Sequence, residues 1–265
     1  MGEKAKQIIV KPLDANPTLK GPAQRLGGIA WPKFLYHSDV RNWRTLFTTF
    51  AGFQIVLCEP AGTPLAVGHT IPIVWDGTIG DLPASIDAVI ERAVQGRWND
   101  VAPTALAALA AIVAPAHRRK GLSSHVVRAM AALAARRGLR SLVAPVRPTL
   151  KSLYPLMPME TYVALTRSDG SPFDPWIRVH WKLGAAQLSI GPKMLVVEGT
   201  VREWEKWTRR KFPNSGSYLV AGALEPITID HDRDLGRYEE PNVWMQHKVG
   251  ASPQRSTYRS SHEAD

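Results

Sequence analysis

The segment V-A-P-A-H-R-R-K-G-L-S, residues 113–123, decides the fold prediction for this chain. An apolar run ends before Pro115, and a helical pattern begins at Leu122. Between them, Gly121 allows a ligand to approach closely where a helix N-terminus offers free N–H groups and a positive dipole. Three consecutive cations precede this glycine: Arg118, Arg119 and Lys120. The segment therefore predicts a cradle for a pyrophosphate group.

Two other kinds of phosphate-binding loop are excluded by their spacing. The chain has no Gly-x-x-x-x-Gly-Lys-Ser/Thr segment, which binds nucleoside triphosphates, and no Gly-x-Gly-x-x-Gly segment, which binds dinucleotides. Neither of these two motifs therefore explains the predicted pyrophosphate cradle.

The distribution of charge supports an anion site at the same place. The chain carries a net charge of +10, and residues 101–159 hold nine basic residues and no acidic one. The nine are Arg118, Arg119, Lys120, Arg128, Arg136, Arg137, Arg140, Arg147 and Lys151. The rest of the chain is close to neutral, so nearly all of the excess charge lies around the loop. A solvated basic face is the alternative explanation.

Hydrophobic patterns on both sides of the loop predict a sheet with a crossover. Residues 105–113 are apolar on both faces, which favours a buried strand, although their alanines also suit a helix. A helical period over residues 122–137 ends at Gly138, and an apolar strand pattern follows at residues 141–146. This order is typical of two parallel strands joined by a helix.

The remaining patterns predict further strands and helices on both sides of this unit. The predicted strands are residues 53–58, 64–75, 193–198 and 218–229. The predicted helices are residues 85–94, residues 176–183 after Asp174-Pro175, and the helix that begins at the capping box Thr200–Glu203.

The loop resembles the acyl-CoA loop of the GNAT superfamily of N-acyltransferases, V-x-P-x-x-R/Q-x-x-G-x-G/A. Val113, Pro115, Arg118 and Gly121 match this pattern, and Ser123 replaces its last small residue. A second GNAT run, Y-x-x-L-G-F, is similar to His180-Trp-Lys-Leu-Gly-Ala. The resemblance covers roughly residues 53–229.

The resemblance implies an α/β (α+β) fold with a mixed, mostly antiparallel central sheet that is flanked by helices and splayed at the acyl-CoA site. It implies acetyl-CoA or another acyl-CoA as co-substrate, with the pantetheine arm near Val113 and the pyrophosphate on the amides of residues 119–123. The implied binding residues are Val113, Arg118, Arg119, Lys120, Gly121, Leu122, Ser123 and Ser124. Some of Arg118, Lys120, Arg128 and Arg147 are expected to reach the adenosine phosphate.

The activity implied is transfer of an acetyl group to the primary amine of a small molecule, which attacks the thioester directly. Family members usually protonate the leaving thiolate with a tyrosine, and this chain has His180 at that place. Tyr154 is the second candidate, because residues 155–172 look like an insertion. A packing role is the alternative for His180. The expected fourth strand offers no carboxylate as a base.

Aromatic residues are expected to form the acceptor pocket or to belong to the core: Trp31, Trp75, Tyr162 and Trp176. A catalytically inactive acyl-CoA-binding or sensing protein of the same fold is the alternative to an enzyme. Nucleic-acid binding is disfavoured, because the cations lack an aromatic stacking platform.

The composition sets the remaining expectations. A chain of 265 residues with 45% hydrophobic residues buries a core, which excludes a disordered or fibrous protein. The single cysteine, Cys58, cannot form an internal disulfide, and no metal is expected, since the acidic run at residues 230–234 fits a solvated loop. Neither a signal segment nor a membrane span is recognised, so a cytoplasmic location is expected.

The chain is expected to contain three parts. Residues 1–26 are expected to form an irregular N-terminal arm, residues 27–247 a single GNAT-like domain with a C-terminal elaboration, and residues 248–265 a disordered tail. The elaboration is expected either to cover the acceptor site or to form a homodimer contact.

Overall fold

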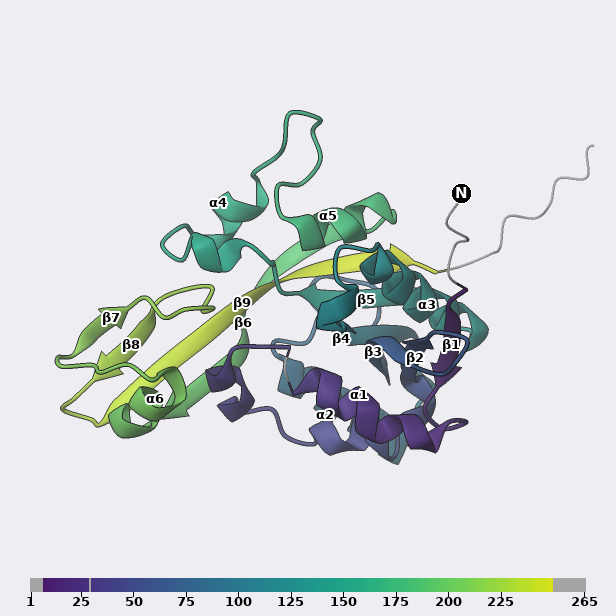
Figure 1. The fold of residues 1–265 in the computed structure, drawn as a ribbon, viewed down its shortest axis with the longest axis horizontal. Coiled ribbons are helices and arrows are strands. Elements are labelled where there is room, and N and C mark those ends of the chain that lie inside the picture. Colours follow the sequence, from purple (N-terminus) through teal and green to yellow (C-terminus); the bar gives the residue numbers. More distant parts are fainter. Residues whose placement is uncertain (1–6, 29, 250–265) are drawn as a thin grey trace, which may run out of the picture.

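The computed structural model describes residues 7–28 and 30–249, which form one twisted sheet with helices on both faces (Figure 1). The strands are β1 (Ile9–Pro12), β2 (Gln54–Cys58), β3 (Pro64–Ile73), β4 (Ala105–Val113), β5 (Ser141–Val146), β6 (Ala186–Gly199), β7 (Gly216–Tyr218), β8 (Ile227–Asp230) and β9 (Leu235–Lys248). The helices are α1 (Lys20–Gly27), α2 (Ile86–Trp98), α3 (Leu122–Arg136), α4 (Met159–Val163), α5 (Pro175–Lys182) and α6 (Val201–Thr208).

The sheet is mostly antiparallel, with one parallel pair at its centre. The strand order is β1-β2-β3-β4-β5-β9-β8-β7, and β6 pairs with β9 outside this path. Strands β4 and β5 are parallel, and α3 is the crossover helix between them. Every other strand pair of the described chain is antiparallel. The expected fold class is therefore confirmed.

Strands β4 and β5 separate soon after they meet. Their pairing runs only from Ala105 opposite Ser141 to Ala107 opposite Val143. Beyond this point β4 continues to Val113 beside β3, while β5 continues to Val146 beside β9. The facing edges of these two strand halves are not paired with each other, so the sheet is splayed here as expected.

A bulge in β4 lies at the beginning of the splay. Ala108 pairs with Thr70 and Ala110 pairs with His69, which leaves Leu109 as the extra residue. Because an inserted residue shifts the alternation of side chains, Leu109 and Ala110 both pack on the core beside α2, whereas Ala108 packs on the core beside α3. The bulge thus directs additional side chains to one face of the sheet.

The two faces carry separate cores. On one face, α2 and the segments that precede β2 pack on residues such as Val67, Ile71 and Trp244. On the other face, α3 and α5 pack on residues such as Leu142 and Val243. Figure 1 shows α1 and α2 on one side of the sheet and α3 and α5 on the other.

The structure corrects the expectation of an irregular arm over residues 1–26. Within its described part, β1 pairs with β2 at the edge of the sheet, and α1 packs over β3. A four-residue edge strand and a short helix have weak local patterns, and the strands that they contact lie about 40 residues or more away in the sequence.

The predicted strand over residues 218–229 is also wrong. Two short strands, β7 and β8, stand in its place, and residues 219–226 between them form a loop that contains Gly222 with a φ of +85°. The apolar residues Ala223 and Leu224 suggest a strand, but they are buried because this loop folds onto the sheet. Of the predicted tail, Lys248 ends β9, and residues 250–265 lie outside the described part of the chain.

Candidate active site

A cavity of about 770 Å³ lies at the splay between β4 and β5. Residues 108–113 of β4 line one side of it, and residues 144–147 at the end of β5 line the other. Val113, Arg118 and Ser123 bring the loop before α3 to its wall. The cavity therefore connects the predicted cofactor loop with the interior of the sheet.

The loop has the backbone conformation of an anion-binding helix N-terminus. Gly121, with a φ of +75°, is the N-cap of α3, and no side chain caps this helix end. A side chain at Gly121 would enter open space, since no atom lies within 4 Å of the position of its Cβ. The N–H of Ser124 donates to the carbonyl of Gly121, whereas the N–H groups of residues 119–123 have no hydrogen-bond partner in the described structure. These free donors are available to an anion.

The side chains of the loop differ in their exposure. Arg118, Arg119 and Lys120 are exposed, and Leu122 is buried. Leu122 therefore anchors the helix start, and the cations face solvent, with Nε of Arg118 donating to the carbonyl of Val113.

Arg147 lies away from this loop. Its guanidinium pairs with the fully buried carboxylate of Glu240 on β9 and donates to the carbonyl of Gly222. Burial by itself would lower the pKa of Arg147, but Glu240 raises it above its usual value. The hydroxyl of Tyr238 also donates to Glu240. Arg147 is thus part of a buried network in the cavity lining, and its guanidinium is already paired with a carboxylate.

His180 lines the cavity from α5, and only 2% of its surface is exposed. Its Nδ1 lies 2.9 Å from Nε2 of His247 on β9, and its Nε2 has no hydrogen-bond partner. Burial, and then the neighbouring His247, lower the pKa of His180 to about 3. Burial also lowers the pKa of His247, and a hydrogen bond with the backbone of Leu183 raises it.

Of Nδ1 of His180 and Nε2 of His247, one donates and the other accepts, because a hydrogen bond between two neutral imidazoles needs one N–H and one lone pair. In the tautomer in which Nδ1 of His180 donates, its buried Nε2 carries a lone pair. In this tautomer His180 can accept a proton in the cavity, and its Nε2 can donate one only after it has been protonated.

Tyr154 lies outside the cavity lining. Its ring packs near Tyr162 and Phe173, and 38% of its surface is exposed. The segment over residues 155–172 contains α4 and loops, so Tyr154 is held away from the splay. Of the two proposed proton donors, the structure brings His180 to the cavity.

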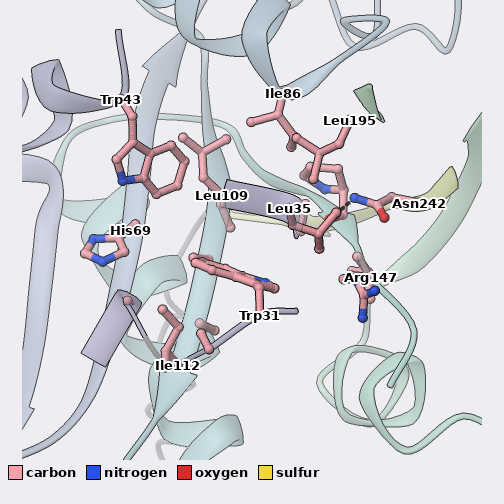
Figure 2. Close-up of a pocket in the computed structure, with 18 of the residues that line it drawn as sticks. Trp31, Leu35, Trp43, His69, Ile86, Leu109, Ile112, Arg147, Leu195 and Asn242 are labelled. Carbon is pink, nitrogen blue, oxygen red and sulfur yellow. Dashed lines mark hydrogen bonds between the residues drawn. The ribbon is translucent and has the colours of Figure 1, made fainter. Parts of the chain in front are cut away.

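The inner part of the cavity is an apolar chamber, which we call the acceptor chamber. Its labelled walls in Figure 2 are Trp31, Leu35, Trp43, His69, Ile86, Leu109, Ile112, Arg147, Leu195 and Asn242. Trp176 also lines the cavity, whereas Trp75 and Tyr162 are buried in the cores outside its lining. No aspartate or glutamate is found among the described residues of the lining.

The C-terminal elaboration contributes to this chamber. Leu195 of β6 and Asn242 of β9 line it, and the Oδ1 atom of Asn242 is buried without a hydrogen-bond partner. The N–H of Asp39 donates to the carbonyl of Val196, which ties the segment with Trp31 and Leu35 to β6. The long strands β6 and β9 therefore contribute to the wall of the cavity.

His69 is a lining residue that the sequence analysis did not identify. It stands in the apolar run A-V-G-H-T-I-P-I of β3 and is 2% exposed. Burial lowers its pKa to about 4. A lone histidine in a buried strand is a weak signal, because only the register of the sheet shows that it reaches a cavity.

No family model matches the sequence. A curated relative, the arginine N-acetyltransferase avaD of Aspergillus versicolor, is 28% identical over 266 residues, which cover 89% of this chain and 91% of the relative. The solved loading GNATL domain of CurA from Lyngbya majuscula has a TM-score of 0.61 at 15% identity over 92% of this chain and 98% of its own. The chain is therefore similar in sequence to an N-acetyltransferase and has the fold of GNAT proteins. The assignment expected from residues 113–123 and from the run at His180 is thus confirmed.

A second structure with the same fold is the GphF GNAT-like decarboxylase in complex with isobutyryl-CoA. It has a TM-score of 0.56 at 19% identity over 92% of this chain and 100% of its own. At these identities the two solved structures support the GNAT fold of the chain. The reaction has to be inferred from the residues of the site.

Neither a metal-binding cluster nor a membrane-spanning helix is found among the described residues. No group of three or more histidine, cysteine, aspartate or glutamate side chains is placed to hold a metal ion there. No helix in that part of the chain has the length and apolar character needed to cross a membrane. Residues 230–234 form the turn between β8 and β9.

Proposed function

We propose that this GNAT protein transfers the acetyl group of acetyl-CoA to the primary amine of a small molecule, which attacks the thioester directly. The observation that carries the proposal is a single cavity at the β4–β5 splay that joins an anion-binding loop to an apolar chamber. We also propose that the protein acts in the cytoplasm, where acetyl-CoA is supplied. We further propose that two copies of the chain form a homodimer.

The free N–H groups of residues 119–123 would hold the pyrophosphate, with help from Arg118, Lys120 and Ser123. The unpaired edge of β4 beyond Ala107 offers backbone donors and acceptors to the amide groups of a pantetheine arm. Such an arm would lead from the loop toward Leu109 and the acceptor chamber. The name of a relative and the isobutyryl-CoA bound to a protein of the same fold support an acyl-CoA.

The reaction requires a neutral amine, one new C–N bond, one broken C–S bond and the movement of one proton from nitrogen to sulfur. His180 is our candidate for the exchange of a proton with the departing sulfur. Because its lowered pKa keeps His180 neutral at rest, His180 would first have to receive a proton that it then donates. Tyr154 remains the second candidate.

The acceptor chamber supports an amine with an apolar or aromatic body. Indole and aliphatic side chains form most of its wall, and the carboxylate of Glu240 is already paired with Arg147. The unpartnered Oδ1 of Asn242 could accept a hydrogen bond from an N–H group of the substrate. The name of the relative contains arginine as the substrate. The guanidinium of arginine would be a second cation in this chamber, and the described residues of the lining offer it no free carboxylate as a partner.

The rival function is an acyl-CoA sensor that binds the thioester without transferring it. One experiment distinguishes the two: calorimetric titration with acetyl-CoA and CoA, followed by a thiol-release assay with a panel of apolar amines, aromatic amines and arginine. Micromolar binding with turnover of an amine is the expected result. Binding without turnover of any amine would support the sensor, and absence of binding would overturn the whole proposal.

A further inference from the structure

His69 on β3 lines the acceptor chamber and has no role in the reaction as described so far. Its ring contacts Phe47 and Trp43 edge to face, with centroids 5.2 Å and 6.1 Å away. Figure 2 shows His69 beside Trp43, on the side of the chamber bordered by β3. The ring is therefore confined by two aromatic side chains in a part of the cavity that an amine with an apolar body would enter.

Gln54 on β2 determines which nitrogen of His69 carries the proton. The Nε2 of Gln54 donates to the carbonyls of Phe50 and Thr70, at 2.9 Å and 2.7 Å. Its Oε1 accepts the N–H of Thr70, so the orientation of the amide is dictated by backbone groups. The Nδ1 of His69 lies 3.2 Å from this same Oε1 and must donate to it. The neutral ring therefore carries its lone pair on Nε2.

This lone pair is free. In the described structure the Nε2 of His69 makes no hydrogen bond, and the ring as a whole is 2% exposed. His69 pairs in register with Ala110, the residue that follows the bulge at Leu109. The bulge turns Leu109 and Ala110 toward the face on which His69 lies, so His69 borders the chamber beside the start of the splay.

We propose that His69 is the catalytic residue that accepts the proton of the acceptor amine, and that Gln54 is the positioning residue that holds its Nε2 unprotonated. This inference rests on the proposed function, because it assigns the step in which the amine of that reaction loses its proton.

The step balances without a further reactant. The amine nitrogen bonds to the carbonyl carbon and becomes a cation, which makes its N–H acidic enough for a weakly basic imidazole to accept the proton. The carbon–sulfur bond then breaks with its electron pair on sulfur. The proton passes from His69 through water in the cavity to His180, which donates it to this thiolate. Burial lowers the pKa of His69 to about 4, so its imidazolium releases the proton readily.

The first experiment is chemical rescue of His69→Ala with the best amine found for the wild-type protein. We expect kcat to fall about 100-fold or more, with unchanged affinity for acetyl-CoA, since general-base catalysis contributes that much. Added imidazole can occupy the vacated space between Trp43 and Phe47, and we expect it to restore kcat about tenfold. His231→Ala is the matched control, because His231 bonds to the carbonyl of Phe212 and is absent from the cavity lining.

The outcomes separate this inference from the proposed function. If the wild type turns over an amine and His69→Ala keeps kcat within about threefold, or loses it without any rescue, the inference is wrong and the function stands. If the wild type turns over no amine, both the proposed function and this inference are wrong.

The second experiment measures the tautomer of His69 in the wild-type protein, which Gln54 is proposed to set. Nitrogen chemical shifts of His69 in the wild-type protein at neutral pH should show a proton on Nδ1 and none on Nε2. The Gln54→Leu variant should give a mixture of the two tautomers and lower kcat about tenfold, with acetyl-CoA affinity retained. A wild-type His69 protonated on Nε2 would overturn the assignment whether or not the variant folds.

Discussion

The two ends of the cavity are built in opposite ways. The cofactor loop is one continuous segment, residues 113–124, whose cations are exposed and whose donors are backbone N–H groups. The acceptor chamber draws its walls from residues between Trp31 and Asn242, and its polar atoms are buried. The loop can therefore bind an anion by local geometry, whereas the chamber exists only when distant segments pack together.

This difference predicts different sensitivities. Exposed charges around the loop are screened by salt and contribute little individually, so its backbone shape should matter most. In the chamber, the two buried histidines have fixed partners, Gln54 for His69 and His247 for His180. Single substitutions there should change the chemistry or the acceptor and leave the binding of acetyl-CoA intact.

The largest effect is expected for Gly121→Glu. The substitution imposes a side chain at a φ of +75° and directs a carboxylate into the open space before α3, where the pyrophosphate would lie. We expect calorimetry to show a loss of acetyl-CoA affinity of at least about 100-fold.

Gly138→Glu is the matched control for this variant. Gly138 follows the other end of α3, has a φ of +70° and also faces open space. It carries the same backbone strain and the same change of charge, so its affinity should stay within about threefold of the wild type. Equal losses in both variants would contradict the location of the pyrophosphate.

The next effect concerns the stability of the chamber against acid. The pKa of His69 is lowered by burial to about 4, and in the unfolded chain it returns to about 6.5, so between these values the unfolded chain binds more protons. Stability is therefore full above about pH 6.5 and falls as the pH decreases through this window. From His69 alone, the free energy of unfolding should be lower at about pH 5 than at about pH 7.5 by on the order of 2 kcal/mol.

Urea unfolding at the two pH values measures this loss. The variant His69→Gln isolates the contribution of His69, because glutamine does not titrate. Its free energy of unfolding should therefore fall less between the two pH values than that of the wild type. The pKa of His180 is lowered to about 3, so His180 should cause part of the pH dependence of stability that remains in the variant, in the same direction. An unchanged pH dependence in His69→Gln would contradict the burial of a neutral His69.

Trp31→Ala should produce a smaller effect, confined to the acceptor. Removing an indole from the chamber wall reduces apolar contact with the substrate, and we expect KM for an apolar amine to rise about tenfold. The affinity for acetyl-CoA should not change. Trp98→Ala is the control, since Trp98 is 88% exposed and lies outside the cavity lining. A parallel loss of acetyl-CoA affinity in Trp31→Ala would mean that the chamber and the loop are not separate.

Salt should have the smallest effect. Raising ionic strength from about 50 mM to about 300 mM should weaken acetyl-CoA binding only a few-fold, because backbone donors share the pyrophosphate with the exposed cations. The kcat at saturating acetyl-CoA should stay constant, since the chamber histidines are buried. A steep decrease of several orders of magnitude would indicate binding to a nucleic-acid backbone instead.

Local patterns predicted much of the secondary structure. Strand β4 has the predicted bounds Ala105–Val113, α3 begins at Leu122 as predicted, and the side chain of Asp174 caps α5 before Pro175. The capping box of Thr200 and Glu203 is present at α6. Each of these features depends on residues within a few positions of one another, and for this reason a sequence pattern contains them.

The failures involve partners that are distant in the sequence. The edge strand β1 depends on β2, and the loop between β7 and β8 is held by the sheet that it covers. Arg147 belongs to a basic segment of the sequence, but its guanidinium pairs with Glu240, 93 residues away. A charge count cannot show that an arginine is already neutralised inside the protein.

The sequence by itself determined the anion-binding loop, because a glycine, a helix start and neighbouring cations act through local backbone geometry. It also determined the strand, helix and strand around the loop, and with them the resemblance to the GNAT superfamily. The tertiary structure alone decided which histidines meet in the cavity, which of their nitrogens are free, and which walls surround an acceptor. The physical reason is that these properties follow from burial and from hydrogen bonds between strands whose register the bulge at Leu109 shifts.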